Sequence, residues 1–499
     1  MKKLTELLKT ETVWLILLFG LAATVRFRGL NQLAFFTYDQ ARDAFYIKRI
    51  LDGEFRLIGT QSSIPGLYTG PLYYYLMAPF LFLFRLNPVG LDYATAFISL
   101  LTLFLLFGLL KKTTKSSFLA IIFTALYAFS PQIVNQSRFA WNPNPLPFLT
   151  LLFLFSLKKI IFQGEKIFLL ILALTIGAAI NLHYSGLALI FILLPIGFFF
   201  AKSLKETFDL KMVVIFLVFL GLFFLPLFLF DCRHGFINAR SLISYLRQGP
   251  APEISPPPFW TGLWDKFVFL FGLAVPLTGF WLKFLTGVSL FSGLGFFVKS
   301  LKEKTFFSLV FLSLFSGVLF ACFYQGSFFN FYLTFLYPLP FLWLASFFGQ
   351  KPERNRSWFF LGLVVVIILG RNFKSLSRPF RPARTIKDLE RVALFLSQKI
   401  NPGENFNLAA LYRGQNRFDH NAVDYRYFLE ARYKIKVPGW DVLDYRNAQI
   451  CYLISEVGQV EIGAVKFWET QLMGALKEEN HWDLGEDYLV YRLVKDKME

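Results

Sequence analysis

The chain has 499 residues, 55% of them hydrophobic, and a mean hydropathy of +0.50. Only 17% of the residues are charged, against about 25% in a typical soluble domain, so the composition excludes an ordinary soluble protein. The net charge of +18 is spread between apolar segments, which disfavours a nucleic-acid partner and fits basic inner loops, anionic lipid headgroups or an anionic substrate. Three scattered cysteines (Cys232, Cys322 and Cys451) predict neither a disulfide framework nor a metal site.

Long apolar segments rich in phenylalanine follow one another from residue 12 to residue 370. Because about 20 apolar residues can cross a bilayer, the predicted fold class is a polytopic α-helical membrane protein of about eleven spans. Lysines precede the first span, and no small-residue cleavage site follows it, which predicts an uncleaved span with a cytoplasmic N-terminus. The expected spans are 12–30, 91–110, 117–134, 145–157, 167–182, 186–200, 212–230, 285–298, 305–324, 330–348 and 357–370.

Two stretches leave their membrane position open. Residues 71–86 are either a full span, which would place Lys111 and Lys112 outside, or an interfacial or re-entrant segment, which would place them inside. Their short length and the aromatic residues clustered at one end favour the interfacial interpretation. Residues 260–282 contain Asp265 and Lys266 among apolar residues and are either interfacial or a further span.

The composition changes near residue 371 to that of a small soluble domain. Residues 386–400 have helical periodicity. Their apolar face consists of Leu389, Val392, Ala393 and Leu396. The chain is therefore expected to divide into a membrane domain, 1–370, and an extracytoplasmic α/β domain, 371–499. Further elements expected in the second domain are strands at 406–411, 450–454 and 488–493 and a helix at 421–433.

A charged cluster, Tyr38-Asp39-Gln40-Ala41-Arg42-Asp43, follows the first span in an expected outer loop, about 31–86. Asp39 and Asp43 are four residues apart, so on a helix they share one face. The opposite, apolar stripe consists of Ala41, Ala44, Ile47 and Leu51. The pattern predicts an amphipathic helix at the outer membrane surface. A carboxylate there can accept a proton from an attacking hydroxyl, and Arg42 can bind a carboxylate or phosphate by two hydrogen bonds. The alternative is that Asp39 caps the helix and the polar face is merely solvated.

Three elements in this order carry a family resemblance: Asp39-Gln40-Ala41-Arg42-Asp43-Ala44, then Leu51-Asp52-Gly53-Glu54-Phe55, then Pro71-Leu72-Tyr73-Tyr74. With them, the chain resembles the polyprenyl-phosphate-dependent glycosyltransferases of the GT-C type, in particular the protein O-mannosyltransferase and lipid A aminoarabinose transferase group. That family has an acidic residue at the start of a surface helix in the first outer loop, many spans and an outer C-terminal domain. The motifs lie within about the first 160 residues, and beyond them the resemblance is one of architecture.

The resemblance implies that Asp39 is the catalytic base, which takes a proton from an acceptor hydroxyl as the sugar leaves its lipid phosphate and the anomeric centre inverts. The donor would be a polyprenyl-phosphate sugar, and the acceptor an unidentified glycan, lipid or protein on the outer face of a bacterial inner membrane. No further cofactor is assigned. Many relatives have a second acid where this chain has Gln40, so a metal bound by paired acids has no support, and Asp43 is the candidate second acid.

Some relatives have a basic residue before the Pro-led helix, where this chain has Gly70, so another cation is expected to bind the phosphate. Arg138, Arg233 and His234 each fall at the outer end of an expected span. A fixed cation there would stabilise the leaving phosphate. The alternatives are headgroup anchoring for the arginines and a structural hydrogen bond for His234.

Three further groups are candidates for substrate contact. His183 ends a span, where the alternative is an interfacial position. Tyr73 belongs to the Pro-led helix. Trp141-Asn142-Pro143-Asn144 could stack on a sugar or an isoprenoid, or could simply be a stiff loop with an interfacial tryptophan.

Two other functional classes remain open. A transporter or flippase of lipid-linked sugars needs ionisable residues in mid-span, and the expected spans hold almost none. A membrane-anchored binding protein would use its outer domain and leave Asp39 replaceable. No glycine-rich phosphate-binding loop is evident, as expected for a lipid phosphate rather than a nucleotide sugar.

Overall fold

The computed structural model describes residues 2–207, 209–249, 258–303, 305–324, 326–349, 355–377, 384–413 and 420–496. The chain forms two compact units. Unit one comprises Met1–Arg28, Phe55–Leu76 and Asp92–Pro379; unit two comprises Gly29–Glu54, Met77–Leu91 and Phe380–Glu499. Unit two thus combines the C-terminal region with two short stretches from the start of the chain.

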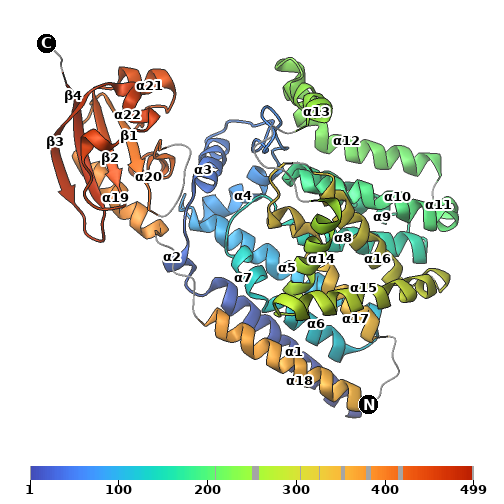
Figure 1. Ribbon diagram of the computed structural model, residues 1–499. Coiled ribbons are helices and arrows are strands. Elements are labelled where there is room, and N and C mark those ends of the chain that lie inside the picture. Colours follow the sequence, from blue (N-terminus) through green and yellow to red (C-terminus); the bar gives the residue numbers. More distant parts are fainter. Residues whose placement is uncertain are drawn as a thin grey trace. The chain divides into compact units, whose positions relative to one another are not determined.

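Unit one consists mainly of helices (Figure 1) and includes the non-helical stretch 55–71, in which Gln61 and Tyr68 form an isolated antiparallel bridge. Two of its helices, α4 and α5, continue into residues of unit two. The helices are α1 (Lys2–Phe27), α4 (Leu72–Leu83), α5 (Val89–Thr114), α6 (Ser117–Ala128), α7 (Pro131–Ser137), α8 (Leu146–Gln163), α9 (Phe168–Leu182), η1 (Tyr184–Leu187), α10 (Ala188–Phe199), α11 (Ala201–Thr207), α12 (Leu210–Arg233), α13 (Ile237–Gln248), α14 (Phe259–Ala274), α15 (Gly279–Lys302), α16 (Phe306–Cys322), η2 (Asn330–Leu336), α17 (Leu339–Phe348) and α18 (Asn355–Leu376).

The membrane character predicted from the sequence is confirmed, but the expected number of spans is not reached by length and composition alone. Among the described residues, five helical segments are long and apolar enough to cross a bilayer, or up to seven if each of two bent pairs counts as one span. The five are Glu11–Leu33, Val89–Thr114, Leu146–Gln163, Leu210–Arg233 and Gly279–Lys302. Several other expected spans are apolar helices shorter than 18 residues.

One expected span, 117–134, is two helices. Between α6 and α7 the chain bends by 65°. Pro131 is the first residue of α7; it lacks the N–H that a continuing helix would use, and its ring collides with a preceding turn. The Pro-led segment 71–86 contains the helix α4 of 12 residues, about 18 Å long at 1.5 Å per residue. This length is short of a ~30 Å hydrocarbon core, and the interfacial position of the segment stays a prediction.

Unit two contains a four-stranded sheet in the order β1-β2-β4-β3. β1 and β2 are parallel, whereas β4 is antiparallel to both of its neighbours. The elements of this unit are α2 (Leu30–Leu33), α3 (Tyr38–Leu51), α19 (Ile386–Lys399), β1 (Phe406–Leu411), α20 (Val423–Tyr433), α21 (Val442–Asn447), β2 (Ile450–Ser455), η3 (Ile462–Ala464), α22 (Trp468–Met473), β3 (Leu476–Asp483) and β4 (Leu489–Lys495).

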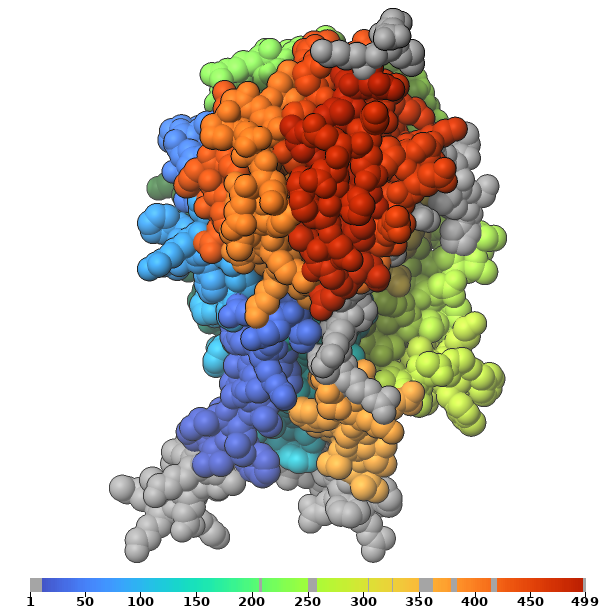
Figure 2. All heavy atoms as spheres, turned by 90° about the vertical axis from the view of Figure 1, so that its left-hand side faces the viewer, coloured from blue at the N-terminus to red at the C-terminus, as the bar shows by residue number. Residues whose placement is uncertain are grey.

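Three of the four strands and both long helices lie where the sequence predicts them. The apolar face of α19 is buried as expected, and its Phe395 packs edge-on against Trp482 of β3, with ring centroids 5.5 Å apart. Figure 2 shows α19 in orange beside the red strands β3 and β4. The sequence analysis missed β3 because it is an edge strand with mostly polar, exposed side chains, without the alternating pattern that identifies a strand.

Candidate functional site

The helix that carries the charged cluster, α3, begins with a capping box. Thr37 is the N-cap: its side chain accepts from the main-chain N–H of Gln40, and the Gln40 side chain accepts from the N–H of Thr37 at 3.1 Å. Asp39 is therefore the second helical residue and not the cap, which corrects the structural alternative considered for it. The reciprocal bonds also give Gln40 a local role, because a glutamine at the third helical position closes such a box.

Arg42 joins the two carboxylates of the cluster. Its Nη1 donates to Asp39 Oδ1 at 2.9 Å, and its Nε and Nη2 donate to Asp43 Oδ1 at 3.1 and 3.0 Å. The side chains differ in exposure: 45% for Asp39, 18% for Arg42 and 3% for Asp43. Asp39 is thus open to solvent, whereas Asp43 is buried beneath the guanidinium.

The apolar stripe of α3 is covered by protein. Ala41, Ala44 and Ile47 are fully buried, and α3 packs on α20. The ring of Phe45 meets that of Tyr427 edge-on at 5.3 Å. This differs from the expected helix lying on the lipid surface, because the stripe has a protein partner that is more than 350 residues away in sequence.

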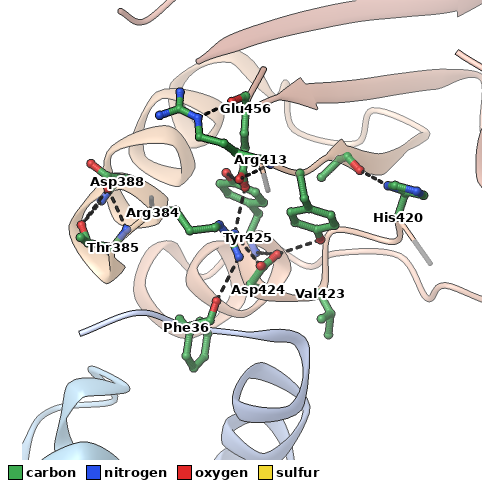
Figure 3. A network of polar contacts seen from close by, with 12 residues as sticks. Phe36, Arg384, Thr385, Asp388, Arg413, His420, Val423, Asp424, Tyr425 and Glu456 are labelled. Carbon is green, nitrogen blue, oxygen red and sulfur yellow. Dashed lines mark hydrogen bonds and ion pairs between the residues drawn. The ribbon is translucent and has the colours of Figure 1, made fainter. Parts of the chain in front are cut away.

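A buried arginine that the sequence analysis did not single out lies next to the start of α3 (Figure 3). Arg384, with a side chain 3% exposed, forms ion pairs with Asp424 at 2.6 Å and Glu456 at 3.0 Å, both fully buried. Its Nη1 donates to the carbonyl oxygen of Phe36 at 3.1 Å. The sequence offered one signal, the Thr385–Asp388 capping box that follows Arg384, but a cap does not reveal a distant partner.

In unit one, the segment before α4 is held by main-chain bonds at Tyr68. The hydroxyl of Tyr184 donates to the Tyr68 carbonyl oxygen at 2.6 Å, and the Tyr68 N–H donates to Asn238 Oδ1 at 2.6 Å. Gly70 has no room for a side chain, because a Cβ there would lie 1.7 Å from Asn181 Oδ1. This close approach is the physical reason why a basic residue cannot simply replace Gly70 in this chain.

Two of the other sequence-predicted residues in unit one hold main-chain atoms. Arg138 Nη1 donates to three carbonyl oxygens at the end of α1, those of Val25, Arg26 and Arg28, at 2.9 to 3.0 Å. His183 Nδ1 accepts the N–H of Ser185 at 3.1 Å and so caps η1. Both arrangements satisfy groups at helix ends, where main-chain atoms lack helical partners.

Of the remaining three predicted residues, Tyr73 is buried, whereas Arg233 and His234 are exposed. Tyr73 is buried, 3% exposed. Arg233 is exposed at the last residue of α12. The His234 ring stacks on Phe230 with ring centroids 4.0 Å apart, and its Nδ1–H donates to the Phe230 carbonyl oxygen at 2.8 Å. Asp39, Arg42 and Asp43 are therefore the predicted residues that direct contacts join into one cluster, within unit two.

A second residue not assigned from the sequence is Lys266 on α14. It is 9% exposed; its Nζ donates to the Gly262 carbonyl oxygen at 3.3 Å and lies 4.1 Å from the ring centroid of Phe328. Within the described ranges it has no carboxylate partner. Buried cations in apolar helices are costly and usually mark a function. Within the same ranges, no three His, Cys, Asp or Glu residues gather as metal ligands.

Comparison with known proteins identifies the fold. Residues 55–237 match the family model of the dolichyl-phosphate-mannose-protein mannosyltransferases. The crystal structure of ArnT from Cupriavidus metallidurans in the apo state is similar over 96% of this chain and 98% of that chain, with a TM-score of 0.60 and 12% identity. The chain has the ArnT fold.

A second ArnT crystal structure, bound to undecaprenyl phosphate, is similar over the same shares with a TM-score of 0.60 and 13% identity. A search of curated protein sequences found no match. The predicted resemblance to this group is thus confirmed, and the ArnT fold extends over nearly the whole chain, in agreement with the resemblance of architecture expected beyond the motif region.

Proposed function

We propose that this protein is an integral membrane glycosyltransferase that transfers a sugar from a polyprenyl-phosphate donor to an acceptor hydroxyl on the outer face of the membrane. The observation that carries the proposal is a half-exposed carboxylate, Asp39, fixed by Arg42 at the start of α3 in a chain with the ArnT fold. The donor class is supported by the undecaprenyl phosphate bound in the second ArnT structure and by the family model matched at 55–237.

In the proposed reaction, Asp39 is the general base. Arg42 binds Oδ1, so Oδ2 accepts the proton of the acceptor hydroxyl. The hydroxyl oxygen attacks the anomeric carbon, the bond from that carbon to the phosphate oxygen breaks, and the lipid phosphate leaves with the electron pair. One displacement inverts the anomeric centre. Asp43, buried under Arg42, orients the guanidinium rather than meeting the substrate.

The leaving phosphate requires a cation, because its negative charge grows in the transition state. We assign this role to Lys266 and Arg233. Lys266 is buried without a carboxylate partner among the described residues, and Arg233 is exposed at the end of α12. Arg138 and His183 are engaged at helix ends and His234 stacks on Phe230, which supports structural roles for these three.

The test is transfer by the purified full-length protein from a radiolabelled polyprenyl-phosphate sugar, with a panel of sugars and of lipid, glycan and peptide acceptors. We expect transfer by the wild type, inversion at the anomeric carbon by NMR of the product, and loss of transfer in Asp39→Asn. Movement of the labelled lipid across a vesicle bilayer without transfer would instead favour a flippase. Transfer that persists undiminished in Asp39→Asn would remove the assigned base.

A further inference from the structure

We infer that Arg384 is a positioning residue for the proposed reaction: it fixes the main chain immediately before α3 and thereby sets where Asp39 points. The inference rests on the proposed role of Asp39. It gives the C-terminal part of unit two a place in catalysis, as the template on which the catalytic helix begins, rather than the role of a separate binding domain.

The first step is the set of contacts on the segment that leads into α3. Arg384 Nη1 donates to the Phe36 carbonyl oxygen at 3.1 Å, and the Ile386 N–H donates to the Ala34 carbonyl oxygen at 2.9 Å. Phe36 directly precedes Thr37, the N-cap of α3. Two alternate carbonyls of one extended stretch are therefore held by two residues of one short C-terminal segment.

Side chains fix the same stretch from another direction. The Phe36 ring lies 5.6 Å from the ring centroid of Tyr427 and 5.8 Å from that of Phe428, both on α20. Five residues after Asp43 on α3, Lys48 forms an ion pair with Glu430 of α20 at 3.2 Å. The start of α3 is thus fixed on both sides of Asp39 by residues from 384–430.

The second step is that Arg384 is itself held by a network of buried polar side chains. Its two carboxylate partners are themselves bonded: Asp424 accepts from the Tyr412 hydroxyl at 3.1 Å, and Glu456 accepts from the Tyr425 hydroxyl at 2.8 Å (Figure 3). Replacing a buried ion cluster by apolar residues is often neutral or stabilising, so such a cluster is weak evidence for stability. Here Nη1 and Nη2 of Arg384 are both engaged, whereas its buried Nε has no hydrogen-bond partner among the described residues. The bonds of the two nitrogens and of the two carboxylates define one direction for the guanidinium, which is what a positioning group requires.

The third step is the location of the network at the sheet. Tyr412 directly follows β1 and Glu456 directly follows β2, and these strands are parallel. The carboxyl edge of parallel strands is where open α/β sheets usually bind ligands. In this unit Arg384 binds at that edge and presents its guanidinium to the Phe36 carbonyl. The chain's own loop therefore takes the place that a ligand takes in other sheets of this kind.

Two hydrogen bonds anchor the stretch before α3: Arg384 to the Phe36 carbonyl and Ile386 N–H to the Ala34 carbonyl. The test removes each of these anchors separately, with matched variants of the full-length protein in detergent. Ile386 is the first residue of α19, a position where proline is well tolerated, and Thr385 before it is already extended, as a residue preceding proline prefers. Ile386→Pro thus removes the N–H that binds Ala34, and Ile386→Ala is the control that shortens the side chain but keeps the N–H. Arg384→Lys keeps the positive charge but loses the two guanidinium nitrogens that bind Phe36 and the carboxylates at the same time. Arg426→Lys is its control, because Arg426 is an equally buried arginine whose bonds go to Asn421, Pro438 and Leu408.

The first readout is amide hydrogen exchange over residues 37–45, which does not depend on catalysis. We expect about tenfold faster exchange in Ile386→Pro and Arg384→Lys, the effect of one lost hydrogen bond, and no such change in Ile386→Ala or Arg426→Lys. Unchanged exchange in both anchor variants, or the same rise in all four, would overturn the positioning role even if the enzyme is active.

The second readout is the kinetics of sugar transfer. We expect kcat to fall about 10- to 100-fold in the two anchor variants, since small misplacements of a catalytic group have effects of this size, with the KM for the donor changed less than about threefold. Combined with Asp39→Asn, neither anchor variant should lower the residual rate further. An undiminished kcat, or an additive loss in the double variants, would contradict the inference. A wild type without transfer activity would overturn the proposed function while leaving the exchange result valid.

Discussion

Nη1 of Arg42 lies 2.9 Å from Oδ1 of Asp39, one turn earlier on the same helix. This bond occupies Oδ1 of Asp39 and makes the direction of the carboxylate depend on Arg42, which in turn is held by the buried Asp43. The cluster is therefore ordered from inside to outside: the buried carboxylate of Asp43, the guanidinium of Arg42 and the exposed carboxylate of Asp39.

Asp39→Asn should reduce the transfer rate by about 10²–10⁴-fold, because an amide cannot accept the hydroxyl proton and general base catalysis contributes this much. The KM for the donor should change little, since the base acts on the acceptor. Asp52→Asn is the matched control: Asp52 lies at the end of the same helix, is 55% exposed and binds Lys48. Steady-state kinetics of both variants check the prediction; equal losses in the two would contradict it.

Arg42→Met should destabilise the protein by about 2–4 kcal/mol, because the buried Asp43 carboxylate loses its guanidinium. Thermal unfolding of the full-length protein measures the loss. Adding Asp43→Asn removes the buried charge, so the double variant should be more stable than Arg42→Met alone. A double variant as unstable as the sum of the two single changes would show that the two residues do not act as a pair.

Gly70→Ala should destabilise the loop before α4, since the added Cβ would lie 1.7 Å from Asn181 Oδ1. We expect a loss of about 1–3 kcal/mol, typical of overpacking. Asn181→Ala opens space there at the loss of its bond to the Phe223 carbonyl. The loss of unfolding free energy in the double variant should therefore be smaller than the sum of the two single losses. Thermal unfolding of the wild type, the two single variants and the double variant measures this. Simple additivity would disprove the steric explanation.

Burial raises the pKa of Glu456 above its ordinary value of 4.5, although Arg384 acts in the opposite direction. A raised pKa in the folded state means that folding takes up a proton, so this group's contribution to stability is present below pH 4.5 and is lost as the pH rises through the folded pKa. The melting temperature of the full-length protein, measured from pH 4 to pH 8, should therefore contain a decrease with rising pH that comes from Glu456. Glu456→Gln should remove this decrease and flatten the slope. Glu486→Gln, at an exposed ion pair with Arg391, should leave the slope unchanged.

Lys266→Met should raise the KM for the lipid donor about tenfold or more, if its buried ammonium binds the donor phosphate by a charge-assisted hydrogen bond worth about 1.5–3 kcal/mol. Lys283→Met removes an exposed lysine of the neighbouring α15 and should leave the KM unchanged. Kinetics over a range of donor concentrations tests both, and an unaltered KM in Lys266→Met would exclude the assignment.

The elements that the sequence predicts well are those with local apolar periodicity. The face of α19 and the strands β1, β2 and β4 belong to this class, because each has a regular set of side chains in the core. β3 escaped prediction because an edge strand needs only main-chain bonds on one side. The span 117–134 was predicted as one helix because its hydropathy does not register the break at Pro131.

The site was only partly predictable for a related reason. Asp39, Arg42 and Asp43 are close in sequence, so helical spacing alone brings them together. Arg384 acts on residues 348 positions away, and no local pattern reports such a partner. Gly70 illustrates the same limit: the space for a side chain there is filled by Asn181 of α9, which is more than 100 residues away in sequence.

The bond from Arg384 to Phe36 joins two parts of the chain that are made at very different times. A ribosome adds about 5–20 residues per second, so Phe36 waits roughly 20–70 seconds for a partner 348 residues later. During that time the carbonyl oxygens of Phe36 and Ala34 lack their donors, the Arg384 side chain and the Ile386 N–H. A chain released before residue 384 would therefore carry α3 without the contacts that Arg384 and Ile386 make to the stretch before it.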